Sequence, residues 1–310
     1  MRELLFMEPC FKPMIWGGHK MREKYGYPIP CDETGEAWVV SGHQNGKSTV
    51  KGGSFDGWKL DELWSRHGEL FGNPTEKDFP LLVKVIDANG DLSIQVHPDD
   101  AYAFANENGS KGKTECWYIL DCEEGADIIV GHHAQSKEEL VQMIDEGKWD
   151  ELLNCFPIHK GDFFYIPSGT VHAIRRGTLI LEVQQNSDVT YRLYDYGRLQ
   201  NGKPRELHLD KSKDVIQCPH RDVATAGDWE QQDGYEMRKL AASEYFTADQ
   251  WKVKTALDLE QNHDFLIVDV TEGQGTVDGI EIKAGDHFIA PYQYGTMHFE
   301  GELEIITSYR

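Results

Sequence analysis

Residues 161–172 read Gly-Asp-Phe-Phe-Tyr-Ile-Pro-Ser-Gly-Thr-Val-His, and this stretch indicates how the chain folds. Gly161-Asp162 suits a tight turn, the next four residues suit a strand, and a Pro/Gly corner leads to His172 at the start of another strand. A related stretch recurs at residues 285–298, where Gly-Asp-His-Phe-Ile-Ala-Pro is followed, after two extra residues, by Gly-Thr-Met-His. The chain therefore contains two copies of one β unit.

The repeat extends outward from this stretch and predicts two domains. Residues 115–125 (Glu-Cys-Trp-Tyr-Ile-Leu-Asp-Cys-Glu-Glu-Gly) resemble residues 263–273 (His-Asp-Phe-Leu-Ile-Val-Asp-Val-Thr-Glu-Gly). A polar connection lies near residues 218–234. We predict a larger domain over residues 1–220, with helical insertions, and a smaller one over residues 234–310.

Short apolar runs between glycines and prolines predict a mainly β fold of the α+β class. The runs cover residues 81–86, 92–96, 116–120, 127–130, 163–166, 179–183 and 189–193. Such spacing is typical of an antiparallel sandwich or barrel. A few short peripheral helices are expected over residues 61–70, over residues 98–106 with Pro98 in the first turn, and after a capping box that begins at Ser136.

The charge balance excludes several classes of partner. The 310 residues include 31 Lys and Arg against 53 Asp and Glu, a net charge of −22. Nucleic acid and anionic membrane surfaces are therefore not expected as partners, and an anionic ligand would need a local basic pocket or a metal. The six cysteines form no CxxC pair, which favours reduced thiols and a cytoplasmic location. The sequence does not predict an oligomeric state.

The spacing of Gly161, Pro167, Gly169 and His172 resembles the second motif of the cupin superfamily, whose fold is a double-stranded β-helix or jelly roll with metal ligands inside the barrel. The resemblance implies two cupin-type units, the first catalytic and metal-binding and the second degenerate. The first cupin motif, H-x-H followed by Glu, is altered, because Gln95 replaces the first histidine, His97 is the second, and the acid comes late at Glu115.

Strand periodicity supports a shared site for these side chains. Residues two apart point to one face of a strand, so Gln95 and His97 project together, as do Lys113 and Glu115. His172 would supply the last ligand from a third strand. Two imidazoles, a carboxylate and an amide oxygen suit one Zn²⁺ with an open position, although Gln95 could instead hydrogen-bond a ligand. The second copy has Tyr245 where His97 would recur, so its histidines, His263 and His298, are expected to be structural.

Most of residues 1–200 resembles type I mannose-6-phosphate isomerase in its short bacterial form. The resemblance implies a zinc enzyme that interconverts mannose 6-phosphate and fructose 6-phosphate, with zinc bound by the residues at 95, 97, 115 and 172 and a catalytic role for Arg192. Longer members of the family carry an additional helical domain. The matching stretches are residues 13–18, 35–41, 79–88, 92–99, 113–115, 161–172 and 182–195.

The chemistry of an aldose–ketose isomerase assigns further candidates. A proton must move between C2 and C1 through a cis-enediol, so anion-stabilising and acid–base groups are needed near the sugar. Arg192 alternates with the apolar Tyr191 and Leu193, which would turn its guanidinium into the barrel; an outward Arg192 paired with a surface acid is the alternative. Lys113 is a second catalytic candidate or a solvated loop lysine.

Three residues are candidates for substrate binding. Lys84 interrupts an apolar strand, so it either reaches the surface or holds phosphate in the pocket. Asp188 is a second candidate for proton transfer, although Ser-Asp is also common in turns. Trp16 could form the floor of a sugar site, although core packing is the commoner role of tryptophan.

Two other functions remain open at this stage. An Fe²⁺ cupin oxygenase would use the same barrel, since fold does not determine function. A non-catalytic sugar-binding cupin is the third interpretation. Gln95 and the late Glu115 argue against the iron site, and Lys113 and Arg192 argue against the non-catalytic one.

Overall fold

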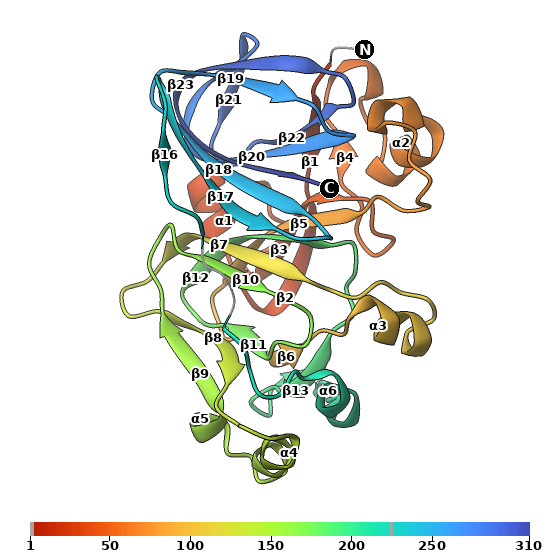
Figure 1. Cartoon of the computed structure of the whole chain (residues 1–310), viewed down its shortest axis with the longest axis vertical. Coiled ribbons are helices and arrows are strands. Elements are labelled where there is room, and N and C mark those ends of the chain that lie inside the picture. The colour runs from red at the N-terminus through yellow and green to blue at the C-terminus, as the bar shows by residue number, and fades with distance from the viewer. Residues whose placement is uncertain (1–2, 223–225) are drawn as a thin grey trace.

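The computed structural model describes residues 3–222 and 226–310 (Figure 1). The helices are α1 (Lys20–Tyr25), α2 (Leu60–Arg66), α3 (Asp100–Asn106), α4 (Lys137–Asp145), α5 (Trp149–Leu152) and α6 (Leu209–Val215), with 3₁₀ turns η1 (Gly53–Phe55) and η2 (Gly68–Phe71). The strands of the first two-thirds of the chain are β1 (Leu5–Glu8), β2 (Cys10–Gly18), β3 (Thr34–Ser41), β4 (Thr49–Val50), β5 (Leu81–Ala88), β6 (Ile94–Val96), β7 (Glu115–Cys122), β8 (Asp127–His132), β9 (Leu153–Pro157), β10 (Phe163–Ile166), β11 (His172–Ile174), β12 (Thr178–Gln185), β13 (Tyr191–Tyr194), β14 (Leu199–Gln200) and β15 (Lys203–Pro204). The remaining strands are β16 (Glu230–Gln231), β17 (Tyr235–Ala242), β18 (Thr247–Val253), β19 (Ala256–Gln261), β20 (Phe265–Val277), β21 (Ile280–Lys283), β22 (His287–Pro291) and β23 (Gly295–Tyr309).

Two antiparallel sheets form the first unit. The six-stranded sheet runs β10-β7-β12-β5-β3-β2, and the five-stranded sheet runs β13-β6-β11-β8-β9. Strands distant in sequence are neighbours in both sheets, as in the jelly roll expected from the cupin resemblance. All seven predicted strand segments are present. The prediction of a mainly β, α+β fold is therefore confirmed.

The second unit is built on a ten-stranded sheet that contains β16 to β23. The chain's first strand also joins this sheet, because β1 pairs antiparallel with β22 and places Leu5 opposite Ile289. Figure 1 shows this segment running beside the strands of the C-terminal third. A hydrophobic core that includes Leu5, Phe79, Phe246 and Phe265 draws on both units. The division at residues 220–234 stays a prediction; residues 223–225 within it lie outside the described residues.

The repeated Gly-Asp turns have matching backbone conformations in the two units. Gly161 and Gly285 both have φ of 91°, and Gly169 and Gly295 have φ of 83° and 92°. This left-handed region is open to glycine at little steric cost, which explains why glycine stands at these corners in both copies.

The helices differ in detail from the predictions. Asp99, not Pro98, begins the helix predicted over residues 98–106: its carboxylate caps α3 by accepting from the Tyr102 amide at 2.8 Å, so Pro98 lies before the helix. The helix predicted over residues 61–70 ends at Arg66 and continues after His67 only as a 3₁₀ turn. Ser136 caps α4 as predicted. In the described ranges, no helix is long and apolar enough to cross a membrane.

Candidate active site

Three predicted site residues lie in register across the five-stranded sheet. Gln95 on β6 is the direct cross-strand partner of His172 on β11, and on its other side it is the partner of Arg192 on β13. Directly opposed residues point to the same face of an antiparallel pair. The sheet therefore presents an imidazole, an amide and a guanidinium in one row.

The six-stranded sheet presents a second row. Trp117, Glu182, Lys84 and Trp38 are successive cross-strand partners on β7, β12, β5 and β3. Glu182 and Lys84 interrupt apolar runs of two buried strands, and the structure brings these opposite charges together, with Lys84 Nζ 3.1 Å from Glu182 Oε1. A buried ion pair replaces hydration that both groups have lost.

Three buried side chains converge in the interior of this first unit. The imidazole nitrogens of His97 and His172 and the carboxylate oxygens of Glu115 form a cluster whose ligand atoms all lie within 4.8 Å of one another. His97 Nε2 is 3.5 Å from Glu115 Oε2, and His172 Nε2 is 3.4 Å from Glu115 Oε1. All three residues are at most 1% exposed. A cluster of nitrogen and carboxylate donors of this kind suits a divalent metal.

The tautomers of the two histidines leave both Nε2 lone pairs directed at the cluster. His97 Nδ1 lies 2.8 Å from the Val189 carbonyl and His172 Nδ1 lies 2.8 Å from the Thr170 carbonyl, so each Nδ1 carries the proton and donates. The two Nε2 atoms then face each other as acceptors at 3.1 Å. Burial lowers the pKa of His97, and lowers that of His172 to about 3, so both imidazoles are neutral. Two neutral acceptors in contact fit a metal ion between them.

Gln95 and Lys113 lie at the edge of this cluster. The Gln95 amide nitrogen is 3.3 Å from His172 Nε2, and an amide flip would present the oxygen instead. Lys113 Nζ is 3.1 Å from His97 Nε2 and 2.5 Å from Glu115 Oε2, although the second contact lacks hydrogen-bond geometry and this oxygen has no hydrogen-bond partner among the described residues. The Lys113 ammonium therefore lies against two of the three candidate metal ligands.

The two buried glutamates of the site differ in pKa. Burial, with the charge of Glu182, raises the pKa of Glu115 to about 7. Burial also opposes the charge on Glu182, but Lys113 and Lys84 outweigh it and hold the pKa of Glu182 below its usual value. Burial alone would lower the pKa of Lys84, yet the carboxylates of Glu182, Glu36 and Glu115 hold it above the usual value. Both pKa shifts favour the charged forms, so Lys84 and Glu182 form an ion pair.

A cavity of about 300 Å³ opens between the sheets beside the cluster. Gln95 and Lys113 line it, so they separate the buried metal-ligand candidates from the open space. Four cationic side chains line this cavity against three carboxylates, in a chain whose overall charge is −22. The local positive excess is the basic pocket that an anionic ligand would require. The cations are Lys84, Lys113, Arg192 and Arg205.

The remaining predicted residues also line this cavity. Arg192 is half-buried, its Nη1 donates to the Glu206 carbonyl at 2.9 Å, and its Nε has no hydrogen-bond partner among the described residues. Trp16 is 5% exposed and packs in the core while one part of it faces the cavity. Asp188 stands at the rim. Lys84 reaches the cavity and does not extend to the surface.

Sequence reasoning missed two residues of this site. Glu182 lies in an apolar strand just as Lys84 does, and the presence of one opposite charge in each of two buried strands was a signal that they pair. Arg205 follows the β14–β15 hairpin and reaches the cavity while both its Nε and Nη2 donate to Asp195, with Nε 2.7 Å from Oδ2. No local pattern marks that arginine.

Together, the fold and the site define a cupin with a buried His/Glu/His cluster able to hold a metal. Residues 4–138 match the family model described as phosphomannose isomerase type I, catalytic domain, and residues 236–310 match mannose-6-phosphate isomerase, cupin domain. The chain belongs to the type I phosphomannose isomerase family, a family of isomerases, as the resemblance of the sequence had indicated.

Individual relatives span the whole chain. The mannose-6-phosphate isomerase ManA of Bacillus subtilis is 48% identical over 99% of both chains, and the Streptococcus mutans mannose-6-phosphate isomerase is 48% identical over 100% of this chain and 99% of its own. A crystal structure of the mannose 6-phosphate isomerase from Bacillus subtilis has a TM-score of 0.96 at 46% identity and covers 99% of both chains. The Salmonella typhimurium enzyme, at 16% identity and a TM-score of 0.79, shares the fold.

Proposed function

We propose that this protein interconverts D-mannose 6-phosphate and D-fructose 6-phosphate through a cis-enediol, with one Zn²⁺ per subunit. The proposal rests chiefly on the convergence of His97, Glu115 and His172 beside a cavity lined by Lys113 and Arg192. Relatives of 48% identity carry the name mannose-6-phosphate isomerase over the full length of the chain.

The metal would be held by His97, His172 and Glu115, with Gln95 as a fourth ligand or as a hydrogen-bond partner. Two neutral imidazoles and one carboxylate are the donors that Zn²⁺ prefers, and they leave a position open toward the cavity. A bound zinc supplies a Lewis acid that polarises a carbonyl and stabilises oxyanion charge. A divalent cation would also repel the ammonium of Lys113, which would then turn from Glu115 toward the cavity.

The residues of the cavity would divide the remaining work. The reaction removes the C2 proton, returns a proton to C1, and moves a proton from the C2 hydroxyl to O1. Arg192, which lines the cavity, would stabilise the negative charge that develops on the sugar oxygens. Lys113 would bind or exchange a proton with a sugar oxygen.

The candidate substrate residues would bind the sugar phosphate at the cavity walls. Lys84 offers a buried ammonium whose charge is already balanced by Glu182. A bound anion would therefore interact with this ammonium alongside Glu182 and would not be its only counter-ion. Asp188 would accept hydrogen bonds from sugar hydroxyls at the rim, and Trp16 would supply an apolar surface.

Isotope exchange tests this function directly. The zinc-loaded protein is incubated with mannose 6-phosphate in D₂O, and NMR follows fructose 6-phosphate and deuterium at C1. Product with deuterium at C1 is the expected result, because an enediol exchanges its proton with solvent. Absence of product would exclude the isomerase function, and product without any deuterium would argue against free exchange of the enediol proton. Metal analysis with oxygen-uptake measurement distinguishes an iron oxygenase, which would consume O₂.

A further inference from the structure

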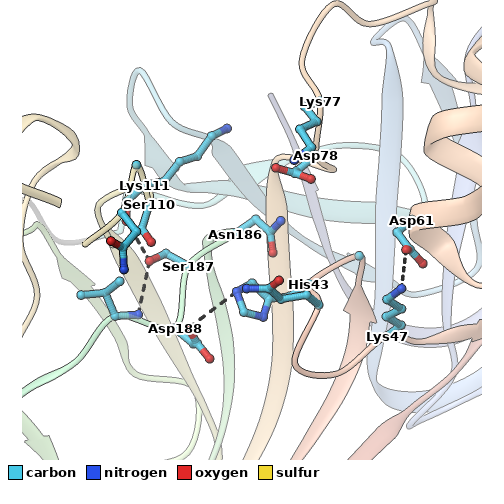
Figure 2. Close-up of a pocket in the computed structure, with 15 residues that line it drawn as sticks. His43, Lys47, Asp61, Lys77, Asp78, Ser110, Lys111, Asn186, Ser187 and Asp188 are labelled. Atoms are coloured by element: carbon cyan, nitrogen blue, oxygen red, sulfur yellow. Dashed lines mark hydrogen bonds and ion pairs between the residues drawn. The ribbon is translucent and has the colours of Figure 1, made fainter. Parts of the chain in front are cut away.

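A second polar cavity, of about 400 Å³, adjoins the site, and Asp188 is the residue that lines both (Figure 2). Asp188, Thr190 and Arg192 alternate along one segment and all line the first cavity. The carboxylate of Asp188 is therefore on the same wall as the proposed catalytic guanidinium. The structure around Asp188 shows how this carboxylate is oriented.

Two side chains from the loop that follows β3 face the Asp188 carboxylate. Asn45 Nδ2 donates to Asp188 Oδ2 at 2.5 Å, and His43 Nε2 lies 3.6 Å from Asp188 Oδ1. The dashed line in Figure 2 marks the second of these contacts. Each oxygen of the Asp188 carboxylate thus has its own neighbour. Asn45 and Asp188 are 143 residues apart in the sequence.

The hydrogen bonds of His43 leave its remaining proton on Nε2, the ring nitrogen nearest to Asp188. The Asn45 amide donates to His43 Nδ1 at 3.2 Å, so Nδ1 is the acceptor and the neutral ring carries its proton on Nε2. Burial lowers the pKa of His43, which keeps the ring neutral. The ring also lies edge-to-face against Trp38, with centroids 5.6 Å apart, and the His43 amide donates to Ser41 Oγ at 3.1 Å. The contact with Trp38 and these hydrogen bonds therefore fix the orientation of the His43 ring.

The charges that line the second cavity are balanced, so they do not favour an ionic ligand there. Lys47 is paired with Asp61 at 2.6 Å, and the three lysines that line the cavity are matched by three aspartates. What distinguishes this cavity is the loop on its wall, whose side chains contact the Asp188 carboxylate. This loop, residues 42–48, has no part in the site as predicted from the sequence.

We propose that His43 and Asn45 are positioning residues, which hold the Asp188 carboxylate so that it accepts hydrogen bonds from hydroxyl groups of the sugar phosphate; this inference rests on the proposed function. Without them, the Asp188 side chain would rotate freely at an exposed rim. Substrate binding would then have to order this side chain, and the entropy lost in ordering it would weaken the affinity for substrate. A misplacement of about 1 Å can cost up to about a hundredfold in rate.

A double-mutant cycle tests this inference. His43→Ala and Asn45→Ala, each alone, should lower kcat/KM for mannose 6-phosphate by about tenfold, mainly through KM, while the melting temperature and the metal content stay near those of the unaltered protein. In the Asp188→Asn background the same substitutions should have little further effect, because their action passes through Asp188. His43→Gln, which retains a donor, should restore part of the loss.

The matched control is His67→Ala. His67 also lies edge-to-face against aromatic rings, those of Phe55 and Trp58, but pairs with the exposed Glu69 away from the site. It should leave kcat/KM unchanged. Losses from His43→Ala that are as large in the Asp188→Asn background, or unaltered kinetics in both single variants, would overturn the positioning role. An unaltered protein without isomerase activity would overturn the proposed function and this inference together, so the two failures are distinguishable.

Discussion

The Nε2 atoms of His97 and His172 lie 3.1 Å apart, and both rings donate their Nδ1 protons to main-chain carbonyls. Neither ring can relieve this contact by changing tautomer without losing a buried hydrogen bond, so both Nε2 lone pairs stay directed at the cluster, as metal ligation requires. The main-chain hydrogen bonds thus orient the ligands before any metal arrives.

His97→Ala is expected to abolish metal binding and activity together. The loss of one imidazole leaves a single histidine and a carboxylate, too few donors for a tight site. Metal content after extensive dialysis, measured by atomic emission, checks this directly. The control is His298→Ala in the second unit, whose imidazole pairs with the exposed Asp258 and should leave the metal content unchanged. Full metal occupancy in His97→Ala would show that the cluster is not the metal site.

Removal of the metal is expected to lower thermal stability as well as activity. A ligand that binds only the folded state stabilises it by mass action, about 2.7 kcal/mol when its concentration is a hundred times its dissociation constant. For a chain of this length that amounts to about 4 °C in Tm. Calorimetry of chelated and zinc-reloaded protein measures the difference. Equal Tm values, with zinc added at saturating concentration, would contradict a zinc site in the core.

Arg192→Ala is expected to retain the metal but to lose most of the turnover. Removal of one preorganised donor to a developing oxyanion costs about a hundredfold or more in kcat. Arg192→Lys keeps the charge without the planar fork, so it should recover only part of the rate. Steady-state kinetics with parallel metal analysis tests both variants. A rate for Arg192→Ala close to that of the unaltered protein would reduce Arg192 to a structural residue.

The period of the strands made part of the site predictable from sequence. Gln95 and His97 share a face because they are two residues apart, and the alternation around Arg192 placed it toward the cavity; both follow from local geometry. The pairing of β1 with β22 was not predictable, because nothing near Leu5 encodes a partner 284 residues away (Leu5 opposite Ile289). Contacts made by loops, such as that of Asn45 with Asp188, likewise depend on the assembled fold.

Lys84→Met is expected to destabilise the fold by about 3–5 kcal/mol, because it leaves the buried carboxylate of Glu182 without its partner. Lys84 Nζ lies 3.1 Å from Glu182 and 3.9 Å from Glu36, and Lys84 is only 5% exposed. Urea unfolding of the metal-free protein measures the loss. The double variant Lys84→Met/Glu182→Gln should be more stable than Lys84→Met alone, since the carboxylate nearest to Lys84 is then neutral; a further loss that simply adds would argue that the two groups do not interact.

Asp195 is expected to make stability depend on pH. Burial opposes its charge, but hydrogen bonds from Arg205 and Arg198 outweigh it and hold the pKa of Asp195 below its usual value. A carboxyl whose pKa is lower in the folded state stabilises that state fully above the pKa of the unfolded chain, about 3.9, and the contribution is lost as the pH falls through the folded-state pKa. Asp195→Asn should therefore unfold about 2 kcal/mol more easily near pH 7.

The difference between Asp195→Asn and the unaltered protein should narrow as the pH is lowered from 7 to about 2, because the contribution of the charged carboxylate is lost as the pH falls toward its lowered pKa. Urea unfolding of metal-free protein at both pH values separates this effect from acid release of a metal. Asp150→Asn, at an exposed position on α5, serves as the control and should show little change at either pH. A gap between Asp195→Asn and the unaltered protein that is as wide in acid as at neutral pH would mean that the two arginines stabilise the fold through packing and not through the charge of Asp195.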